Sequence, residues 1–133
     1  AVHAGWRGTA LGIAGKAVRV MAEQFHTRPE DLSAAVGPSI GPCCYEVDGP
    51  VFNVLSERGG SDRVLRPGGR EGRWMLDLPL ANRIQLERAG MQPERIFTSG
   101  FCTCCRPDLF FSHRRDGAKT GRHLNFILLW RGK

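Results

Sequence analysis

A histidine, an arginine and two glycines lie close together at the start of the sequence, in His3-Ala4-Gly5-Trp6-Arg7-Gly8. The apolar lead before this motif and the helical pattern after it predict a strand-to-helix corner. Glycine adopts backbone conformations that a Cβ penalises, so peptide N–H groups at Gly5 and Gly8 can point at a ligand. The positive end of the following helix favours an anion there. His3 could therefore be a metal ligand beside an anion pocket, although a lone histidine is more often structural.

A second group of side chains that could do chemistry is Ser112-His113-Arg114-Arg115-Asp116. His113 could be a base or a metal ligand, and Arg114 or Arg115 could clamp a phosphate. Equally, the two arginines could pair with Asp116, Asp108 or Glu46 and only hold a hairpin together. The structural role is the preferred interpretation, and the role of His113 is left open.

The five cysteines form two clusters, Cys43-Cys44 and Cys102-Thr103-Cys104-Cys105. The odd count and the absence of a secretory signal argue against a disulfide framework. Adjacent cysteines on one strand point to opposite faces, so a closed structural zinc site is the less favoured alternative. Most of these thiols are interpreted as small buried hydrophobic side chains, and their individual roles are left open.

Length and composition predict one soluble, cytoplasmic domain over residues 1–133. The chain is 41% hydrophobic and 24% charged, and it contains neither a run of ~20 apolar residues nor a signal peptide. Its net charge of +6 comes almost wholly from scattered arginines with no aromatic stripe between them, which argues against nucleic-acid binding and for a modest attraction of anions. Because Val2 and His3 read like the end of a strand already under way, we expect a further segment before Ala1.

The spacing of apolar residues predicts a helix over residues 9–25, with Thr9 as its N-cap. Its inner face would carry Ala10, Ala14, Val18, Met21 and Phe25. A buried strand is predicted over residues 32–40. The Gly-Pro turns within residues 37–47 make the next loop stiff; such a loop commonly lines a pocket at a strand end, but it could equally be an ordinary rigid connection.

The middle of the chain predicts a helix over residues 50–58 and a polar, glycine-rich surface excursion over residues 59–62 and 66–73. A short strand is predicted over residues 74–78. Asp77 would then begin a helix that Gly90 ends.

The segment after that helix, Gln92-Pro93-Glu94-Arg95-Ile96, echoes Arg28-Pro29-Glu30-Asp31-Leu32 after the first helix. A five-residue match leaves open whether a helix-loop-strand unit is duplicated. Farther along, strand-like runs over residues 109–113 and 122–130, joined by turn residues, predict an antiparallel hairpin.

Several motifs, in this order along the chain, resemble those of one known family. They are His3-Ala4-Gly5-Trp6-Arg7-Gly8, Gly37-Pro38-Ser39-Ile40-Gly41-Pro42 with Cys43-Cys44-Tyr45-Glu46-Val47, Asp77-Leu78 with Ala81-Asn82, Cys102-Thr103, Phe110-Phe111-Ser112-His113-Arg114-Arg115-Asp116-Gly117 and Thr120-Gly121-Arg122. The sequence is similar to the YfiH/YlmD-type family, first described as multicopper polyphenol oxidase laccases and now regarded as purine nucleoside phosphorylases with adenosine deaminase activity.

The resemblance implies an α/β (α+β) sandwich with helices packed on a mixed sheet, related to bacterial toxin deamidase domains. It implies a zinc-dependent enzyme that acts on adenosine, inosine, guanosine or methylthioadenosine, with phosphate as the second substrate. Phosphorolysis needs a phosphate anchor, for which Arg7 and the backbone of Gly5 and Gly8 are candidates. Arg7 could instead be a buried tie between elements.

The family holds its metal through two histidines and a cysteine, and only one of these has a counterpart here, His3. Cys43, Cys44 and His113 are not assigned as replacements, because they belong to other motifs. The other two ligands belong to an upstream half, so we expect the chain to be the C-terminal part of a domain. We expect that part alone to bind zinc weakly, to be inactive and to expose apolar surface.

Two other functions stay open at this point. The older family description implies a copper-dependent polyphenol oxidoreductase, but four histidines without a His-x-His pair argue against several copper sites. The alternative is a non-catalytic module that binds a partner, because some relatives are discussed as editing factors in peptidoglycan precursor synthesis.

Overall fold

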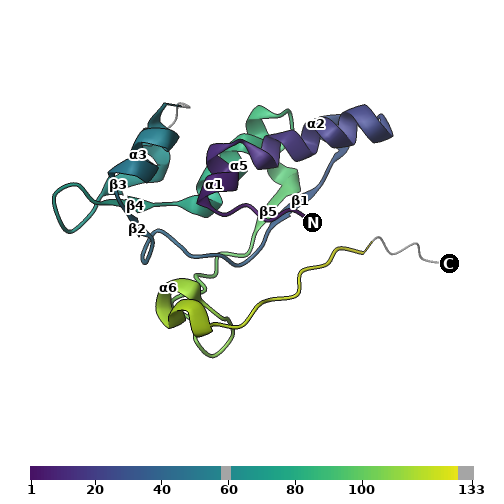
Figure 1. Cartoon of the computed structure of the whole chain (residues 1–133). Helices are drawn as coiled ribbons and strands as arrows, with labels where there is room; N and C mark the ends of the chain where they lie inside the picture. Colours follow the sequence, from purple (N-terminus) through teal and green to yellow (C-terminus); the bar gives the residue numbers. More distant parts are fainter. Residues whose placement is uncertain (58–60, 129–133) are drawn as a thin grey trace.

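The computed structural model describes residues 1–57 and 61–128, which form a mixed α/β arrangement of short helices and two small sheets. The helices are α1 (Trp6–Ala10), α2 (Ile13–Phe25), α3 (Gly49–Ser56), α4 (Ser61–Val64), α5 (Leu78–Arg88) and α6 (His113–Asp116), with 3-10 turns η1 (Pro29–Asp31), η2 (Pro93–Arg95) and η3 (Gly117–Lys119). The strands are β1 (Ala34–Val36), β2 (Glu46–Val47), β3 (Leu65–Pro67), β4 (Trp74–Leu76) and β5 (Ile96–Thr98). Figure 1 shows α1, α2 and α5 together on one side of β1 and β5, with α6 on the other side.

The predicted helix over residues 9–25 is two helices, because Gly12 interrupts it. Gly12 has a φ of +74°, a left-handed conformation that favours glycine, and α2 starts directly after it. Thr9 is therefore not an N-cap. It lies inside α1, fully buried, and its hydroxyl accepts a hydrogen bond from the Asn82 amide of α5 at 3.0 Å. This buried pair fixes the N-terminal corner to α5.

The core on one side of the molecule forms around Leu76, which is completely buried in β4. Strand β4 pairs with β2 and β3 in an antiparallel sheet, and Phe52 of α3 stacks on Trp74 with ring centroids 4.2 Å apart. The helix predicted over residues 50–58 is confirmed as α3, and Arg58 lies outside the described residues. Of the strand predicted over residues 74–78, only residues 74–76 form β4, because Asp77 caps α5 and Leu78 begins it. In the predicted surface excursion, residues 66–73 are mostly exposed, but residues 65–67 also form β3.

The second core joins two similar units. Helix α2 leads through η1 into β1, and α5 leads through η2 into β5. The two strands pair in parallel, with Ala34 opposite Ile96, and the two helices pack together through Val18 and Leu86. The echo between the two Pro-Glu segments therefore corresponds to a repeated helix-turn-strand arrangement. The first of these strands is three residues long, much shorter than the predicted span of 32–40.

Helix α5 begins and ends as the sequence predicts. The Asp77 carboxylate accepts a hydrogen bond from the Leu80 N–H at 3.0 Å, which caps the first turn. Gly90, with a φ of +98°, follows the last turn. On α2, by contrast, Met21 and Phe25 are exposed, so only Ala14 and Val18 of the predicted face reach the core with Ala10 of α1.

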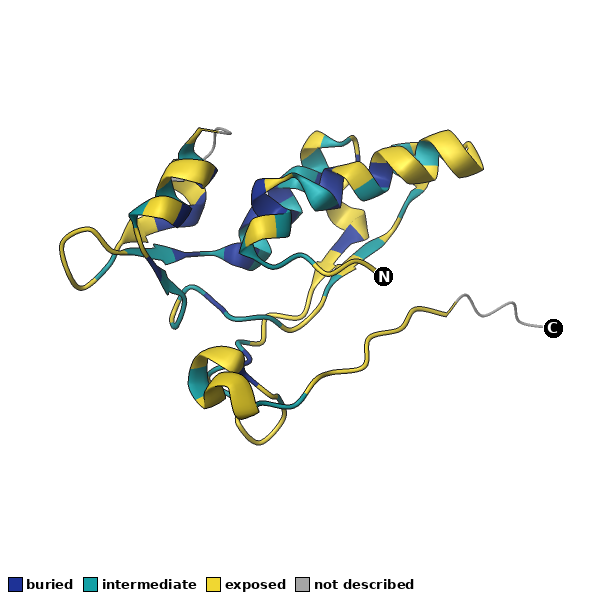
Figure 2. Ribbon diagram, in the orientation of Figure 1, coloured by how far each residue is buried: buried dark blue, intermediate teal, exposed yellow. Residues whose placement is uncertain are grey.

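The predicted hairpin is wrong. Residues 109–112 form no strand, Ser112 caps the short helix α6, and residues 122–128 run as an extended segment without a strand partner among the described residues. The remaining predicted strand residues, 129 and 130, lie outside the described part of the chain. In Figure 2 residues 122–128 are exposed.

Among the described residues, no helix has both the length and the apolar character that crossing a membrane requires.

Candidate functional site

The N-terminal corner places the His3 imidazole on the outside of the molecule. His3 is exposed, and its Nε2 atom lies 3.2 Å from the position that a Cβ on Gly5 would occupy. The ring therefore folds back close to Gly5, at a distance where a Cβ on this residue would make the ring shift. An exposed imidazole that lies outside the hydrophobic cores is accessible to a metal ion or a substrate.

Arg7 is also exposed, so it is not a buried tie between elements. Its guanidinium lies 4.6 Å from the centroid of the Trp6 ring, in cation–π contact. Burial raises the pKa of Tyr45, and the charges of Arg114 and Arg7 partly oppose this rise. The two arginines thus act on the same phenol, and Arg7 keeps its donors at the surface, where an anion can reach them.

The helix dipole attracts an anion to this corner less strongly than the sequence predicts, because the helix is short. Helix α1 contains five residues, and the break at Gly12 separates it from α2. Because the dipole sums over aligned peptide units, five residues supply only a small positive end. The candidate anion contact therefore depends on the Arg7 side chain more than on the helix.

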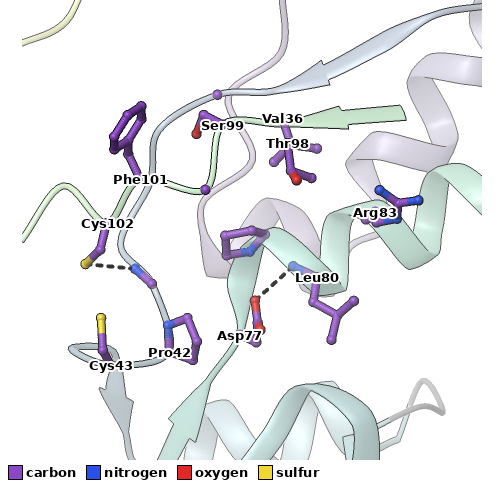
Figure 3. A pocket seen from close by; sticks show the side chains of 14 residues that line it. Val36, Pro42, Cys43, Asp77, Leu80, Arg83, Thr98, Ser99, Phe101 and Cys102 are labelled. Atoms are coloured by element: carbon purple, nitrogen blue, oxygen red, sulfur yellow. Dashed lines mark hydrogen bonds between the residues drawn. The ribbon is translucent and has the colours of Figure 1, made fainter. Parts of the chain in front are cut away.

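A pocket of about 330 Å³ lies where β1 and β5 end. It is lined by Val36, Gly37, Gly41, Pro42, Cys43, Asp77, Pro79, Leu80, Arg83, Thr98, Ser99, Gly100, Phe101 and Cys102 (Figure 3). Ligands commonly bind beyond the carboxyl ends of parallel strands. The stiff loop within residues 37–47 does line a pocket, as one of the two interpretations of the sequence expects.

The charged groups of this pocket are partly committed to the fold. Arg83 donates to Glu87 at 2.8 Å and to the Ile96 carbonyl at 3.1 Å, which ties α5 to β5. Asp77 accepts from the Leu80 backbone N–H in the first turn of its own helix. The sequence-predicted residues His3, Gly5, Arg7 and Gly8 are not part of this lining.

Four of the five cysteines meet beside the pocket. The sulfurs of Cys43, Cys44, Cys102 and Cys105 all lie within 4.8 Å of one another. None of these four residues is buried, so their interpretation as buried hydrophobic side chains is wrong. The sequence contained a signal that this interpretation missed: two residues separate Cys102 from Cys105, which is the spacing of a zinc knuckle.

The local environment separates the acidities of these thiols. Partial desolvation alone would raise the pKa of Cys102, but hydrogen bonds from the backbone N–H groups of Gly41, Cys105 and Cys104 and from the Cys43 thiol lower it to about 6. Partial desolvation and the contact with Cys105 raise the pKa of Cys43 to about 11. The contact with Cys105, followed by partial desolvation, also raises the pKa of Cys44.

The two arginines that follow His113 hold the loops together. Arg115 pairs with Asp116 at 2.7 Å and donates to the Thr103 carbonyl at 2.9 Å and the Phe110 carbonyl at 2.9 Å. Arg114 donates to the Glu46 carbonyl at 2.9 Å and lies over the Tyr45 ring. The pair of Arg115 with Asp116 agrees with the preferred structural role, but the two arginines hold loops and not the predicted hairpin. His113 is exposed at the start of α6.

His3 fits the part of a single metal ligand and no more. Its ring is accessible, but among the described residues the group of side chains that could hold a metal is the four-cysteine group, which does not include a histidine. One imidazole does not hold zinc, because a zinc site needs three or four protein donors. Any metal bound through His3 requires donors beyond those that this chain brings there.

Comparison with known proteins places these features in a family. The family described as multi-copper polyphenol oxidoreductase laccase matches residues 1–130. The chain belongs to this family.

Relatives within the laccase-like family carry the name of another enzyme. The chain is 48% identical over 128 residues to purine nucleoside phosphorylase YlmD of Geobacillus stearothermophilus, covering 94% of this chain and 46% of the relative. It is 36% identical over 133 residues to human purine nucleoside phosphorylase LACC1, covering 94% of this chain and 29% of the relative. The chain thus spans less than half the length of these relatives.

Solved structures of laccase-like family members have the same fold as the chain. The structure of Bacillus licheniformis YfiH matches with a TM-score of 0.85 at 42% identity, over 90% of this chain and 45% of that one. YlmD from Geobacillus stearothermophilus matches with a TM-score of 0.84 at 46% identity, over the same shares. The resemblance to the YfiH/YlmD family and the mixed α/β fold class are confirmed, and the chain corresponds to part of those structures.

Proposed function

We propose that this chain is part of a zinc-dependent purine nucleoside phosphorylase that also deaminates adenosine. The observation that carries the proposal is the 48% identity to a purine nucleoside phosphorylase over nearly the whole chain. The exposed His3 imidazole, which lies close to Gly5, supplies a metal ligand, and the exposed Arg7 guanidinium of the same N-terminal segment supplies an anion contact.

In this proposal the chain contributes one of three zinc ligands, His3, and the rest of the protein contributes the other two. Zinc with an open coordination position supplies a Lewis acid and an activated water, which is what adenosine deamination requires. Within this chain, Gly5 keeps the imidazole in place and Arg7 contacts the phosphate. The substrate class is adenosine, inosine, guanosine and methylthioadenosine.

Phosphorolysis places a further demand on this chain. A phosphate oxygen forms a bond to the ribose C1 atom while the bond from C1 to the purine breaks, and negative charge must be held at both ends. A guanidinium binds phosphate in bidentate fashion and stays charged at all relevant pH values, which suits Arg7 to this role. The backbone N–H groups around Gly5 and Gly8 are the supporting contacts.

The test measures purine release from adenosine and inosine by the protein at its full natural length, with and without phosphate and with and without a chelator. We expect His3→Ala to reduce release by more than the roughly 10- to 100-fold that loss of a metal-supporting residue costs. Arg7→Ala should raise the KM for phosphate, and Arg7→Lys should restore part of it. His26→Asn, which replaces an exposed histidine at the end of α2, is the matched control and should change neither.

Two results would reject the proposal in its parts. Unchanged phosphate dependence in Arg7→Ala would remove the clamp, and chelator-resistant activity with full activity in His3→Ala would remove the metal role. Oxygen uptake with phenolic substrates, in place of purine release, would instead establish the polyphenol oxidoreductase that the family description names.

A further inference from the structure

The four-cysteine group joins two loops that are far apart in the sequence. Cys43 and Cys44 belong to the loop after β1, and Cys102 and Cys105 belong to the loop after β5. The Cys105 sulfur lies 3.6 Å from that of Cys43 and 3.4 Å from that of Cys44. The parallel pairing of β1 and β5 brings these loops to the same edge, so the fold itself assembles the group.

The backbone holds the two loops in register around the sulfurs. Thr103 N–H donates to the Ser39 carbonyl at 3.0 Å, and Ser39 and Cys102 form an isolated parallel bridge. Gly41 N–H donates to the Cys102 sulfur at 3.2 Å. A Cβ on Gly41 would lie 3.2 Å from the Cβ of Cys102 and 3.5 Å from the Cys43 sulfur, so a glycine is what allows this close approach.

The distances between the sulfurs suit a shared metal ion better than a disulfide. A disulfide needs two sulfurs about 2.05 Å apart. Zinc lies about 2.3 Å from each of four thiolates in a tetrahedral site, which separates the sulfurs by about 3.8 Å. The two shortest separations described above are close to this value, and the upper limit of 4.8 Å for the group leaves only a small contraction on binding.

The surroundings suit a centre with net negative charge. A zinc ion with four thiolates carries two negative charges, which nearby cations and N–H donors must offset. Arg115 donates to the carbonyl of Cys104 at 3.2 Å, and Arg114 lies 3.5 Å from the carbonyl of Cys44. The backbone N–H group of Gly41 faces the sulfur of Cys102 as a further donor.

We propose that Cys43, Cys44, Cys102 and Cys105 bind a structural zinc ion, at a site separate from His3. Binding displaces the thiol protons and changes no oxidation state. Four sulfur donors favour zinc over the hard cations, and four protein ligands close the coordination sphere. Because Cys43 and Cys102 also line the pocket, the ion fixes the two loops that form one of its walls.

The experiment uses the protein at its full natural length, purified without added metal and analysed for metal content. Zinc is then replaced by cobalt, whose thiolate charge-transfer and tetrahedral d–d absorption report sulfur ligands. We expect Cys102→Ser and Cys105→Ser each to lose this sulfur-rich spectrum and one equivalent of zinc. Cys104→Ser is the matched control, because Cys104 belongs to the same loop but not to the group, and it should retain both.

The wild-type protein alone can overturn the proposal, whether or not the variants fold. Absence of sulfur-bound metal, iron in place of zinc, or a disulfide between Cys105 and Cys43 or Cys44 in the freshly purified protein would each do so. His3→Ala should leave the sulfur-rich cobalt spectrum intact, which separates this site from the one in the proposed function. Loss of the spectrum in His3→Ala, with normal circular dichroism, would show that the two sites are not separate.

Discussion

The position of the His3 imidazole depends on one missing side chain, that of Gly5. Gly5 has an ordinary extended backbone, with φ of −67° and ψ of 174°, so alanine is compatible with its conformation. The conflict is between the new Cβ and the Nε2 atom of the ring, at 3.2 Å. A flexible side chain resolves such a conflict by moving, which costs little stability but changes where the imidazole points.

We therefore expect Gly5→Ala to change the free energy of unfolding by less than about 0.5 kcal/mol while lowering purine release about tenfold or more. Chemical denaturation measures the first quantity and steady-state kinetics the second. Gly49→Ala, at the start of α3 with open space around its Cβ position, is the control and should change neither. Full activity in Gly5→Ala would show that the imidazole needs no support from this residue.

The residues of the candidate sites were only partly readable from the sequence. The corner motif identified His3 and Arg7 by type and spacing. The spacing from Cys102 to Cys105 also points to a metal site, although the cysteine clusters taken separately favour another interpretation. The participation of Cys43 and Cys44 could not be read at all, because it follows from the parallel pairing of strands that lie some sixty residues apart.

The ends of a helix can be predicted from the sequence where a single residue determines the local backbone conformation. Asp77 and Gly90 marked the two ends of α5, since a carboxylate caps a first turn and a left-handed residue ends a last one. The break at Gly12 was missed, because a glycine inside an apolar helical pattern is often tolerated. Tertiary contacts of α1 with α5 decide that case, and they are not local.

Gly90, at the end of α5, lies close to Pro29 of the other repeated unit. This close approach predicts how much stability a substitution of Gly90 loses. Its φ of +98° is strained for any residue with a side chain, and a Cβ there would lie 3.1 Å from the Cβ of Pro29 in η1. Gly72 has a φ of +70° with nothing near its Cβ position, so it isolates the backbone cost.

We expect Gly72→Ala to lower the free energy of unfolding by about 1 kcal/mol. Gly90→Ala should lower it by more. The excess, roughly 1 kcal/mol, measures the overlap with Pro29. Urea denaturation of the two variants and the parent provides both values. Equal losses of unfolding free energy in the two variants would mean that η1 moves away from the end of α5 without loss of stability.

For the whole molecule, the hairpin prediction failed for a physical reason. A strand-like pattern of β-branched and aromatic residues shows that a segment can pair, but it does not supply the partner. Residues 122–128 have that pattern and no strand partner among the described residues, so they remain extended and exposed. The expectation of exposed apolar surface is confirmed here, since Leu124 and Phe126 are 88% and 81% exposed.

The difference in burial predicts a small loss of stability for exposed apolar residues of the 133-residue chain and a large loss for a buried one. Leu124 and Phe126 lie outside both cores, so replacing both with serine should change the free energy of unfolding by less than about 0.5 kcal/mol. Leu76→Ala, at a fully buried position of β4, should cost about 2 to 5 kcal/mol.

Sedimentation velocity should show less self-association for the double serine variant, because it removes part of an exposed apolar patch. A large loss of stability in that variant would mean that the C-terminal segment packs against the rest of the chain in solution.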